Sequence, residues 1–420
     1  MALLPIKSTL VTTAKKTVWL HSGMLFLLLH LMARKQRIAI YQIMLAGRNR
    51  RGPHIFFPWF FAKYQEYPNS SFELFYFIKT NDEVGVKQEF TARGIPLDRI
   101  EFLPVQNNRF KAKIEMWQLS RALRKHKINL LQTLAIDSPE EQIPQMEKLV
   151  GRIKLGFTVT YNGIPTAFAN DYDKRFEKNR AKYGRLFHKV QFDGLLSWYD
   201  DMKPFVSSSS LFSKKPFVYT IESRFCDASR YYPEEKENTI VFASALVNYK
   251  HPMMFLKAIN LIFTESPELL EGWKVRMIGT GPEEGKALNF ISENGLGKII
   301  EVTSGLSDIS PILRKSKVYV STQEIENFPS LSMNEAMAAG NAIIARNVGR
   351  THLFVKHGEN GLLSQTDDYQ GITQALRTYL SDTSIQKKFE NQSIELCKTV
   401  HTPENFNRQI DEFWMEVLTA

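Results

Sequence analysis

Short apolar runs alternate with longer amphipathic stretches along most of the chain, which predicts strands that alternate with helices. Before residue 200 the predicted strands are Arg37–Met44, Phe72–Lys79, Ile100–Pro104, Asn129–Thr133, Phe157–Asn162 and Gln191–Trp198. A basic helix is predicted at Lys111–Lys127. This alternation is typical of an α/β fold with a parallel sheet. We therefore expect Gln191–Trp198 to be the last strand of a first, doubly wound domain.

The pattern restarts after Ser207–Pro216, a segment with linker composition. Phe217–Glu222 is predicted to be a connecting strand, and Glu404–Leu418 an amphipathic terminal helix. Strands of a second domain are predicted at Thr239–Leu246, Trp273–Ile278, Ile299–Val302 and Val318–Ser321. A length of 420 residues also predicts two domains or more. We expect an N-terminal extension at 1–36, domains at 37–215 and 216–400, and a terminal helix segment at 401–420.

One stretch of the second domain, residues 321–349, combines a loop, a short helix, a buried strand and a glycine turn. Phe328-Pro329-Ser330 ends the preceding strand, and Ser330–Ala339 predicts a helix that Gly340 ends. Ala342–Ala345 predicts a strand covered on both faces. A helix that begins at the end of a strand is suited to an anion, because its first amides and its dipole favour negative charge.

Glu335, in the middle of that helix, has two interpretations. Ser332-Met-Asn-Glu335 matches the S-x-x-E capping box, in which the glutamate binds an amide at the helix start. In the other interpretation, Glu335 binds a ligand held beside the helix. The spacing alone does not decide between these two roles.

The sequence EAMAAG, at Glu335–Gly340, follows a Phe-Pro turn and precedes an apolar strand and Val348-Gly349. In this context it resembles the donor-site signature of the retaining GT-B glycosyltransferases of family four, the glycosyl transferases group 1. The resemblance covers residues 37–420, with its specific motifs mostly in the second half. It implies an α/β fold of two Rossmann-like, doubly wound parallel-sheet domains facing across a cleft, with a C-terminal helix that crosses back to the first domain. It also implies sugar transfer from a nucleotide donor with retention of configuration, without a metal and without a cofactor.

The resemblance assigns donor-binding roles residue by residue. Glu335 would accept hydrogen bonds from the donor ribose, and Lys250 would neutralise the diphosphate. Amides at the helix start would face the sugar and the diphosphate, and glycine turns would let the nucleotide approach the backbone closely. The donor-binding set is Gly47, Lys250, Gly279, Gly281, Pro282, Gly305, Phe328, Pro329, Ser330, Leu331 and Glu335.

Three positions depart from the family pattern. The family has a glutamate eight residues before Glu335, where this chain has Asn327; Glu326 lies one residue further away. Asn162 occupies the position where relatives tend to carry a histidine near the transferred sugar. Ala245 occupies the position of a second diphosphate cation, an arginine. The resulting candidate catalytic residues are Asn327, Glu326 and Asn162.

These departures leave a second interpretation open: a GT-B-fold protein that binds a nucleotide or a glycan without transferring sugar. Retaining transfer does not obviously need a protein base, however, since the leaving-group oxygen can accept the proton. We therefore favour a hexosyltransferase of cell-surface polysaccharide or glycoconjugate biosynthesis. A Rossmann-type oxidoreductase or epimerase is a third interpretation, but the first turn lacks the G-x-G-x-x-G fingerprint.

The charge of the chain predicts an anionic partner. The net charge is +10 and the pI is near 9.3. Nucleotide phosphates, lipid phosphates or an acidic glycan would fit, whereas no nucleic-acid-binding motif accompanies the charge. Arg48, Arg50 and Arg51 in the first loop either hold an anionic acceptor or form a solvated basic loop. The basic run Lys174–Lys189 is either a solvated helix face or a surface for phospholipid or acidic glycan.

The remaining features concern location. Cys226 and Cys397 provide neither a disulfide framework nor a metal cluster, which favours a reducing cytoplasm. Thr17–Ala33 is apolar, but shorter than the roughly 20 residues of a spanning helix. Basic residues flank it, which suits a helix lying in an anionic membrane surface; the alternative is a helix packed on the protein. We expect a cytoplasmic protein, peripheral on the membrane, that binds a nucleotide sugar and a glycan or lipid-linked saccharide acceptor.

Overall fold

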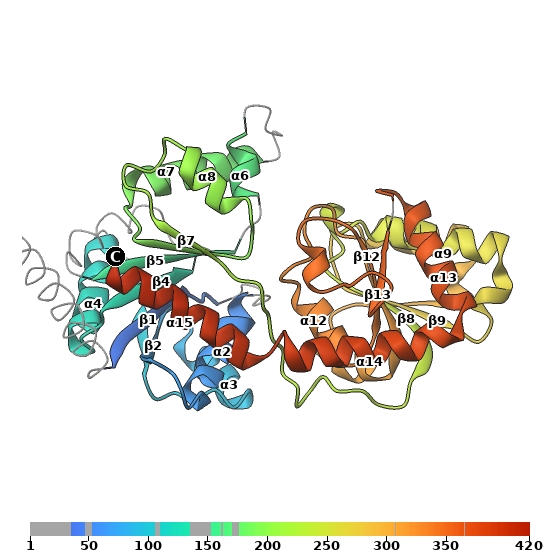
Figure 1. Cartoon of the computed structure of the whole chain (residues 1–420), viewed down its shortest axis with the longest axis horizontal. Helices are drawn as coiled ribbons and strands as arrows, with labels where there is room; N and C mark the ends of the chain where they lie inside the picture. Colours follow the sequence, from blue (N-terminus) through green and yellow to red (C-terminus); the bar gives the residue numbers. More distant parts are fainter. Residues whose placement is uncertain are drawn as a thin grey trace, which may run out of the picture. The chain divides into compact units, whose positions relative to one another are not determined.

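Two parallel β-sheets, each accompanied by helices, form the computed structural model (Figure 1). The structure describes residues 35–46, 53–105, 110–134, 153–160, 163–169, 176–306, 308–364 and 366–420. Every strand pairing with a recorded register is parallel. The predicted α/β fold with Rossmann-like parallel sheets is therefore confirmed.

The first sheet has seven strands in the order β3-β2-β1-β4-β5-β6-β7. Their bounds are β1 Gln36–Ile43, β2 Phe72–Thr80, β3 Ile100–Pro104, β4 Leu130–Leu134, β5 Lys154–Val159, β6 Gly194–Ser197 and β7 Phe217–Thr220. The helices between them are α2 Pro53–Glu66, α3 Glu83–Ala92, α4 Lys111–Lys125, α6 Ile164–Ala167, α7 Glu177–Lys189 and α8 Met202–Ser208. Ile38 of β1 pairs with Leu74 on one side and Leu130 on the other, so the order reverses at β1 as in a doubly wound sheet.

One strand prediction for this sheet is wrong. The sequence made Gln191–Trp198 the last strand, but β7 adds a further strand beside β6. Met202–Ser208, within and just before the predicted linker, forms helix α8. The polar linker composition therefore hid a short helix, whereas the strand at Phe217–Thr220 was predicted as a connection between the domains and is instead an edge strand of the first sheet.

The second sheet has six strands in the order β10-β9-β8-β11-β12-β13. Their bounds are β8 Glu237–Ala243, β9 Lys274–Ile278, β10 Ile300–Thr303, β11 Ser316–Ser321, β12 Ala342–Arg346 and β13 Gly361–Ser364. The α-helices are α9 Pro252–Glu265, α10 Glu284–Glu293, α11 Ser310–Lys315, α12 Leu331–Ala338, α13 Tyr369–Ser381 and α14 Thr383–Thr399. Short 3-10 turns occur at η2 Asn248–Lys250, η3 Pro267–Leu270, η4 Leu296–Lys298 and η5 Thr351–Leu353.

Helices cover both faces of this sheet, α9 and α13 on one side and α12 and α14 on the other (Figure 1). Val318 and Val320 of β11 and Ile344 of β12 lie in one hydrophobic core with residues of α9 and α13. Alternate residues of the strands face α12, so both faces need apolar side chains. The apolar run Ala342–Ala345 is therefore a buried strand, as predicted.

The terminal helix α15, Pro403–Thr419, ends against the first sheet's helices. Trp414 packs on Phe60, Tyr64 and Phe72, with ring centroids 6.5, 5.6 and 5.5 Å away. Asp411 accepts a hydrogen bond from the Tyr64 hydroxyl. The predicted return of the C-terminal helix to the first domain is confirmed.

Packing divides the chain into two compact units. The first holds the described residues up to Thr158, with Arg185–Gly194 and Asp411–Ala420; the second holds Val159–Gly184 and Leu195–Ile410. The domain boundaries given above from the sequence stay predictions. Within the described ranges, none of the helices has both the length and the apolar character needed to cross a bilayer. Thr17–Ala33 lies outside those ranges.

Candidate functional site

Several predicted donor-binding residues lie where strands of the second sheet end. Lys250 follows β8, Gly279 and Gly281 follow β9, and the loop 322–330 follows β11. The strand order reverses between β8 and β11, which makes this edge the switch point of the sheet. Ligands of open parallel sheets bind outside the carboxyl ends of the strands at such a point.

Hydrogen bonds join the turn after β8 to the loop after β11. The Thr322 hydroxyl donates to the carbonyls of Lys250 and His251, at 2.8 and 2.9 Å. The Glu324 amide donates to the Tyr249 carbonyl at 2.9 Å. The Lys250 ammonium in turn donates to the side-chain oxygen of Gln323. The fold thus holds Lys250 against a loop 72 residues further along the chain.

Lys250 has no carboxylate partner among the residues described. Its side chain is partly buried, and burial lowers its pKa to about 8. An ammonium held this way lacks a nearby counter-charge, so an anion bound beside it gains a strong electrostatic attraction. Ala245, at the other expected cation position, lies in the same turn and supplies no charge.

The glycine turn after β9 packs directly on the turn that carries Lys250. A Cβ atom on Gly279 would lie 1.9 Å from the Ser244 carbonyl oxygen, and one on Gly281 would lie 2.3 Å from that of Leu246. The Glu283 amide, one residue beyond Pro282, donates to the same Leu246 carbonyl at 2.9 Å. Only glycine fits so close to another backbone segment. Gly305, by contrast, has open space around it.

The loop after β11 leads into α12 through a buried Phe328 and a cis Phe328–Pro329 peptide. Ser330 is the N-cap, and its hydroxyl accepts a hydrogen bond from the Met333 amide at 3.4 Å. Leu331 is the first helical residue, and Gly340, with φ +77°, follows the helix end as predicted. The capping-box interpretation is wrong, since Ser332 lies inside the helix rather than at the cap.

Glu335 faces a group of polar residues. Its carboxylate accepts a hydrogen bond from the Tyr231 hydroxyl, and the guanidinium groups of Arg224 and Arg230 lie near enough to influence it. Burial outweighs these contacts and raises the pKa of Glu335 to about 7. Tyr231, Arg224 and Arg230 lie in the connection between β7 and β8, far from Glu335 in sequence, so no local pattern could identify them as its neighbours.

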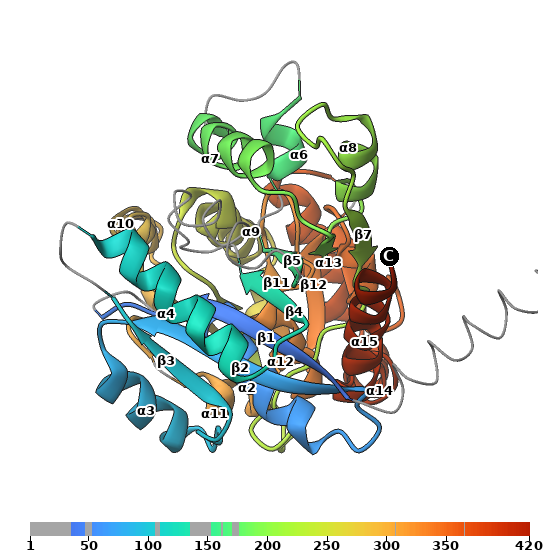
Figure 2. The same ribbon diagram turned by 90° about the vertical axis from the view of Figure 1, so that its left-hand side faces the viewer.

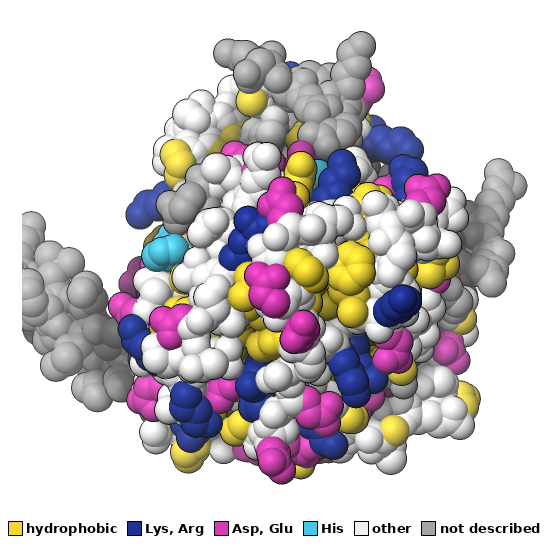
Figure 3. All heavy atoms as spheres, turned by 90° about the vertical axis from the view of Figure 1, so that its right-hand side faces the viewer, with side chains coloured by type: hydrophobic (Ala, Val, Ile, Leu, Met, Phe, Trp, Pro, Cys, Tyr) yellow, Lys and Arg dark blue, Asp and Glu magenta, His cyan; other side chains and the backbone are white. Residues whose placement is uncertain are grey.

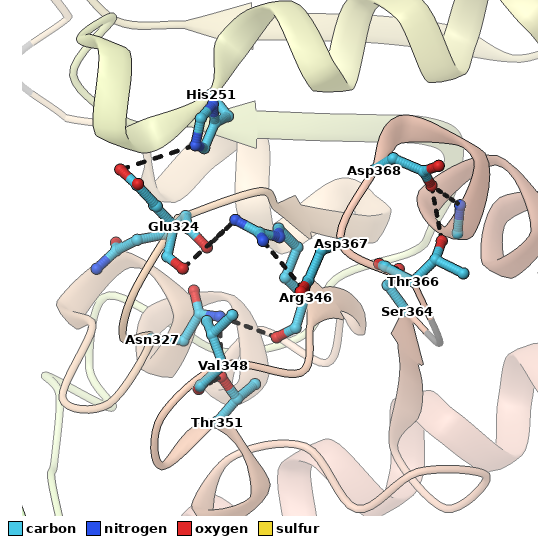
Figure 4. Close-up of polar contacts among 12 residues, drawn as sticks. His251, Glu324, Asn327, Arg346, Val348, Thr351, Ser364, Thr366, Asp367 and Asp368 are labelled. Atoms are coloured by element: carbon cyan, nitrogen blue, oxygen red, sulfur yellow. Dashed lines mark hydrogen bonds and ion pairs between the residues drawn. The ribbon is translucent and has the colours of Figure 1, made fainter.

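Asn327 and Glu326 both make internal hydrogen bonds. Asn327 accepts from the Ser321 hydroxyl at 2.6 Å and donates to the Arg346 carbonyl and the Thr351 hydroxyl, at 3.3 and 2.9 Å (Figure 4). The Glu326 carboxylate accepts from the Phe328 amide at 2.9 Å and from the Arg350 amide at 2.8 Å. Burial raises the pKa of Glu326 to about 7 despite these bonds. In this structure both residues brace the loop.

Two buried arginines complete the bracing, and sequence reasoning did not single them out. Arg346 donates to the carbonyls of Gln323 and Glu324, each at 3.4 Å, and pairs with Asp367 at 3.1 Å (Figure 4). Arg350 donates to the carbonyls of Trp198 and Ile221, at 3.0 and 2.9 Å. An arginine at the end of an apolar strand was the available signal for Arg346.

The other predicted site residues are not described by the structure. Asn162, Gly47, Arg48, Arg50 and Arg51 lie outside the described ranges. Within those ranges, no three His, Cys, Asp or Glu side chains are grouped as a metal site would require.

Comparisons with known proteins agree with this geometry. Residues 228–396 match the family model of the glycosyl transferases group 1. An alpha-1,4-N-acetyl-D-galactosaminyltransferase of Campylobacter jejuni, whose name includes a saccharide-PP-undecaprenol, is 24% identical over 184 residues, 44% of this chain and 48% of that protein. The D-inositol 3-phosphate glycosyltransferase of Streptomyces avermitilis is 24% identical over 155 residues, 35% of this chain and 33% of that protein. The alignments span less than half the length of the curated relatives they match.

Solved structures are similar over most of the chain. A glycosyltransferase from Rickettsia africae has a TM-score of 0.66 and 16% identity, covering 92% of this chain and 99% of that one. Anabaena HepE in complex with UDP and glucose has a TM-score of 0.66 and 13% identity, covering 90% and 99%. At such identities the likeness establishes the fold. The chain therefore has the GT-B fold and carries, at residues 228–396, a glycosyl transferases group 1 domain.

Proposed function

We propose that this chain is a retaining glycosyltransferase that moves a sugar from a nucleotide-sugar donor to a glycan or lipid-linked acceptor. The observation that carries the proposal is Lys250, a partly buried cation at the switch point of the second sheet that has no carboxylate partner in the described structure. A diphosphate would supply the missing negative charge. The family match over residues 228–396 supports the same site.

The proposed chemistry assigns the described residues as follows. Lys250 and the amides at the start of α12 stabilise the charge that develops on the departing nucleoside diphosphate. Glu335 accepts hydrogen bonds from the ribose, beside Tyr231. The bond between the sugar's anomeric carbon and the β-phosphate oxygen breaks as the acceptor oxygen bonds to the same face. The acceptor proton passes to the departing phosphate oxygen, so no protein base is required.

Glu326 and Asn327 act in this proposal as positioning residues. Their side chains hold the loop that presents Phe328–Leu331, and both are buried. Roles for Asn162 beside the transferred sugar, for Gly47 beside the donor and for Arg48, Arg50 and Arg51 toward an anionic acceptor remain part of the proposal. We further propose that the reaction takes place in the cytoplasm, at the inner membrane face, in polysaccharide or glycoconjugate biosynthesis.

A direct test is titration of the purified chain with UDP, the ligand in the solved HepE complex, followed by a thermal-shift screen of nucleotide sugars. A ligand that binds only the folded protein raises its melting temperature. We expect a nucleoside diphosphate to stabilise the protein and a nucleotide sugar to yield product with the donor's anomeric configuration. The absence of stabilisation by any nucleoside diphosphate would refute the donor site.

The second candidate function is nucleotide or glycan binding without transfer. The observation in its favour is that Glu326 and Asn327, at and beside the family's first glutamate position, are both engaged in internal hydrogen bonds. Donor hydrolysis separates the two functions, because a transferase deprived of acceptor usually passes sugar slowly to water. Tight binding of nucleotide sugars with neither hydrolysis nor transfer would favour the binding protein.

A further inference from the structure

Helix α4 presents to solvent a face of basic and aromatic side chains. The side chains exposed along its described part are Lys113, Trp117, Arg121, Arg124 and Lys125, all of them basic or aromatic. Phe110, at the N-cap, continues the same line. Residues three and four apart on a helix lie on one face. Phe110, Lys113, Trp117, Arg121 and Arg124 therefore form one line, named here the α4 stripe.

The aromatic members of the α4 stripe are unusually exposed. Phe110 is 60% and Trp117 56% exposed, the largest values among the aromatic side chains described. The opposite face of the helix is fully used for packing, since Met116, Leu119 and Leu123 are buried. Trp117 is therefore not a core residue that is slightly displaced. A large aromatic side chain as exposed as Trp117, in line with basic side chains, marks a candidate contact surface.

The charges of the stripe are uncompensated. In the described part of the protein, Lys113, Arg121 and Arg124 have no ion-pair partner. The helix's one acidic residue, Glu115, points inward and pairs with the buried Lys79 at 2.5 Å. Lys125, at the edge of the stripe, pairs with Glu101 of β3 at 2.8 Å. By contrast, basic and acidic side chains intermingle on the face shown in Figure 3.

We propose that the α4 stripe docks on an anionic lipid surface. Tryptophan is favoured at the boundary of headgroups and acyl chains, because its apolar ring can enter the acyl region while its N–H stays hydrated. Arg121, whose guanidinium lies 5.5 Å from the Trp117 ring centroid, is placed to contact the headgroup of the lipid into which the ring inserts. No described element lies over α4 in Figure 2, where the helix crosses the near side of the sheet.

The side-chain chemistry favours lipid over an acidic glycan. An acidic glycan would pair with the cations, but reading its hydroxyls also takes hydrogen-bond acceptors, and the side chains of the stripe offer none. A membrane surface needs no such acceptors, and it binds a straight, convex face of basic and aromatic side chains. The stripe is separate from Thr17–Ala33 in sequence and is independent of the donor site, so vesicle binding and nucleotide binding can succeed or fail separately.

The first experiment measures co-sedimentation of the full chain with vesicles of phosphatidylcholine containing phosphatidylglycerol. Each basic residue near an anionic surface contributes about fivefold to the partition coefficient. We expect Arg121→Glu/Arg124→Glu to lower the partition coefficient by at least roughly 25-fold. Binding to pure phosphatidylcholine vesicles should be weak for both proteins.

A matched control is available in the second unit. Lys274 and Lys298 are exposed and, within the described structure, unpaired. Lys274→Glu/Lys298→Glu changes the net charge by the same amount and should leave vesicle binding close to wild type. Both double variants should keep the wild-type circular dichroism spectrum and melting temperature, which shows that they fold. Equal losses in the two double variants, or no loss in the α4 variant, would overturn the proposal.

The second experiment locates Trp117 directly. Vesicles with brominated acyl chains quench the fluorescence of a tryptophan that enters the bilayer. We expect quenching in the wild type that is largely lost in Trp117→Phe. The control Leu288→Phe, at a side chain that is 47% exposed in the second unit, should be quenched like the wild type. Full quenching in Trp117→Phe would place another segment in the membrane and refute the stripe. Binding of the stripe to alginate but not to vesicles would refute lipid in favour of an acidic glycan.

Discussion

Lys250 and Glu335 lie in the same unit, but the fold surrounds their charges differently. Glu335 has a hydroxyl donor and two nearby guanidinium groups. Among the described residues, Lys250 contacts the amide oxygen of Gln323 and the ring of Tyr249, neither of them charged, and burial lowers its pKa. A cation that the protein leaves uncompensated is suited to an anionic ligand, whereas Glu335 is already oriented before any ligand binds.

Lys250→Ala should weaken UDP binding by roughly 10- to 100-fold, the usual value of one hydrogen bond to a charged group. Isothermal titration calorimetry measures this directly. Lys274→Ala, which removes an exposed lysine of β9, should change the affinity less than about twofold. Equal affinities for wild type and Lys250→Ala would exclude Lys250 from the site.

UDP affinity should also depend on pH through the same lysine. Because the pKa of Lys250 is lowered to about 8 in the free protein, the ammonium is present below pH 8 and lost above it. A bound diphosphate favours the charged form, so binding above pH 8 must take up a proton. Affinity should then fall by up to about tenfold per pH unit. The Lys250→Ala variant should show a flat profile between pH 8.5 and 9.5, where the phosphate, Glu326 and Glu335, with pKa values raised to about 7, are already ionised.

Glu326→Ala tests the bracing of the loop. The substitution leaves the buried amides of Phe328 and Arg350 without an acceptor, which costs about 1–3 kcal/mol for each group. Chemical denaturation should show a lower free energy of unfolding, and UDP affinity should fall with it. Glu301→Ala removes a solvent-exposed ion pair with Arg276 and should cost at most about 1 kcal/mol. Similar costs for the two variants would mean that Glu326 does not brace the loop.

The elements around the site are fixed by close backbone approach as much as by side chains. The turns after β8 and β9 touch through Gly279 and Gly281, and Gly340 lets the chain reverse after α12. These family-like glycines are therefore needed for backbone packing, in addition to any contact with a nucleotide. A glycine needed for backbone contact is recognisable from sequence only when its surroundings are already known.

Gly281→Ala should therefore disrupt the turn that holds Lys250. The new Cβ would lie 2.3 Å from the Leu246 carbonyl oxygen, and backbone cannot move aside cheaply. We expect a lower melting temperature and a weaker affinity for UDP. Gly285→Ala is the matched control on α10, where the Cβ meets open space, and it should be neutral or stabilising by about 0.5–1 kcal/mol. If both variants behave alike, the close approach does not matter.

In the molecule as a whole, α15 connects the two units along one helix, since Asp411–Ala420 belong to the first unit and the residues before them to the second. Its last part buries Trp414 among Phe60, Tyr64 and Phe72. The described residues of the proposed donor site lie in the second unit. Stability of the first unit and binding of nucleotide should therefore be separable.

Trp414→Ala should lower the free energy of unfolding of the first unit by about 3–5 kcal/mol, the usual cost of deleting a buried tryptophan side chain. Denaturation followed by circular dichroism measures this loss, and calorimetry should find UDP affinity unchanged within about twofold. Met415→Ala, at the adjacent exposed position, should cost less than about 0.5 kcal/mol. A large loss of UDP affinity in Trp414→Ala would show that the two units are coupled.

Local pattern predicted most strands and helices, the parallel sheets, and a helix at Ser330–Ala339 with its glycine stop. These features follow from the periodicity of apolar residues and from backbone preferences over a few positions, which a sequence carries directly. The return of the terminal helix and the choice of Lys250 came instead from the resemblance, and the place of Lys250 at the switch point depends on the strand order in the structure.

Only the tertiary structure decided which polar side chains are hydrogen-bonded to other residues of the protein. Glu326 and Asn327 are engaged by Arg350 and Thr351, and Arg350 reaches Trp198, 152 residues earlier. Ser330 rather than Ser332 caps α12, and Tyr231 binds Glu335. Such pairings depend on which segments the fold brings together, and a hydrogen bond between residues far apart in the chain leaves no periodic trace in either segment.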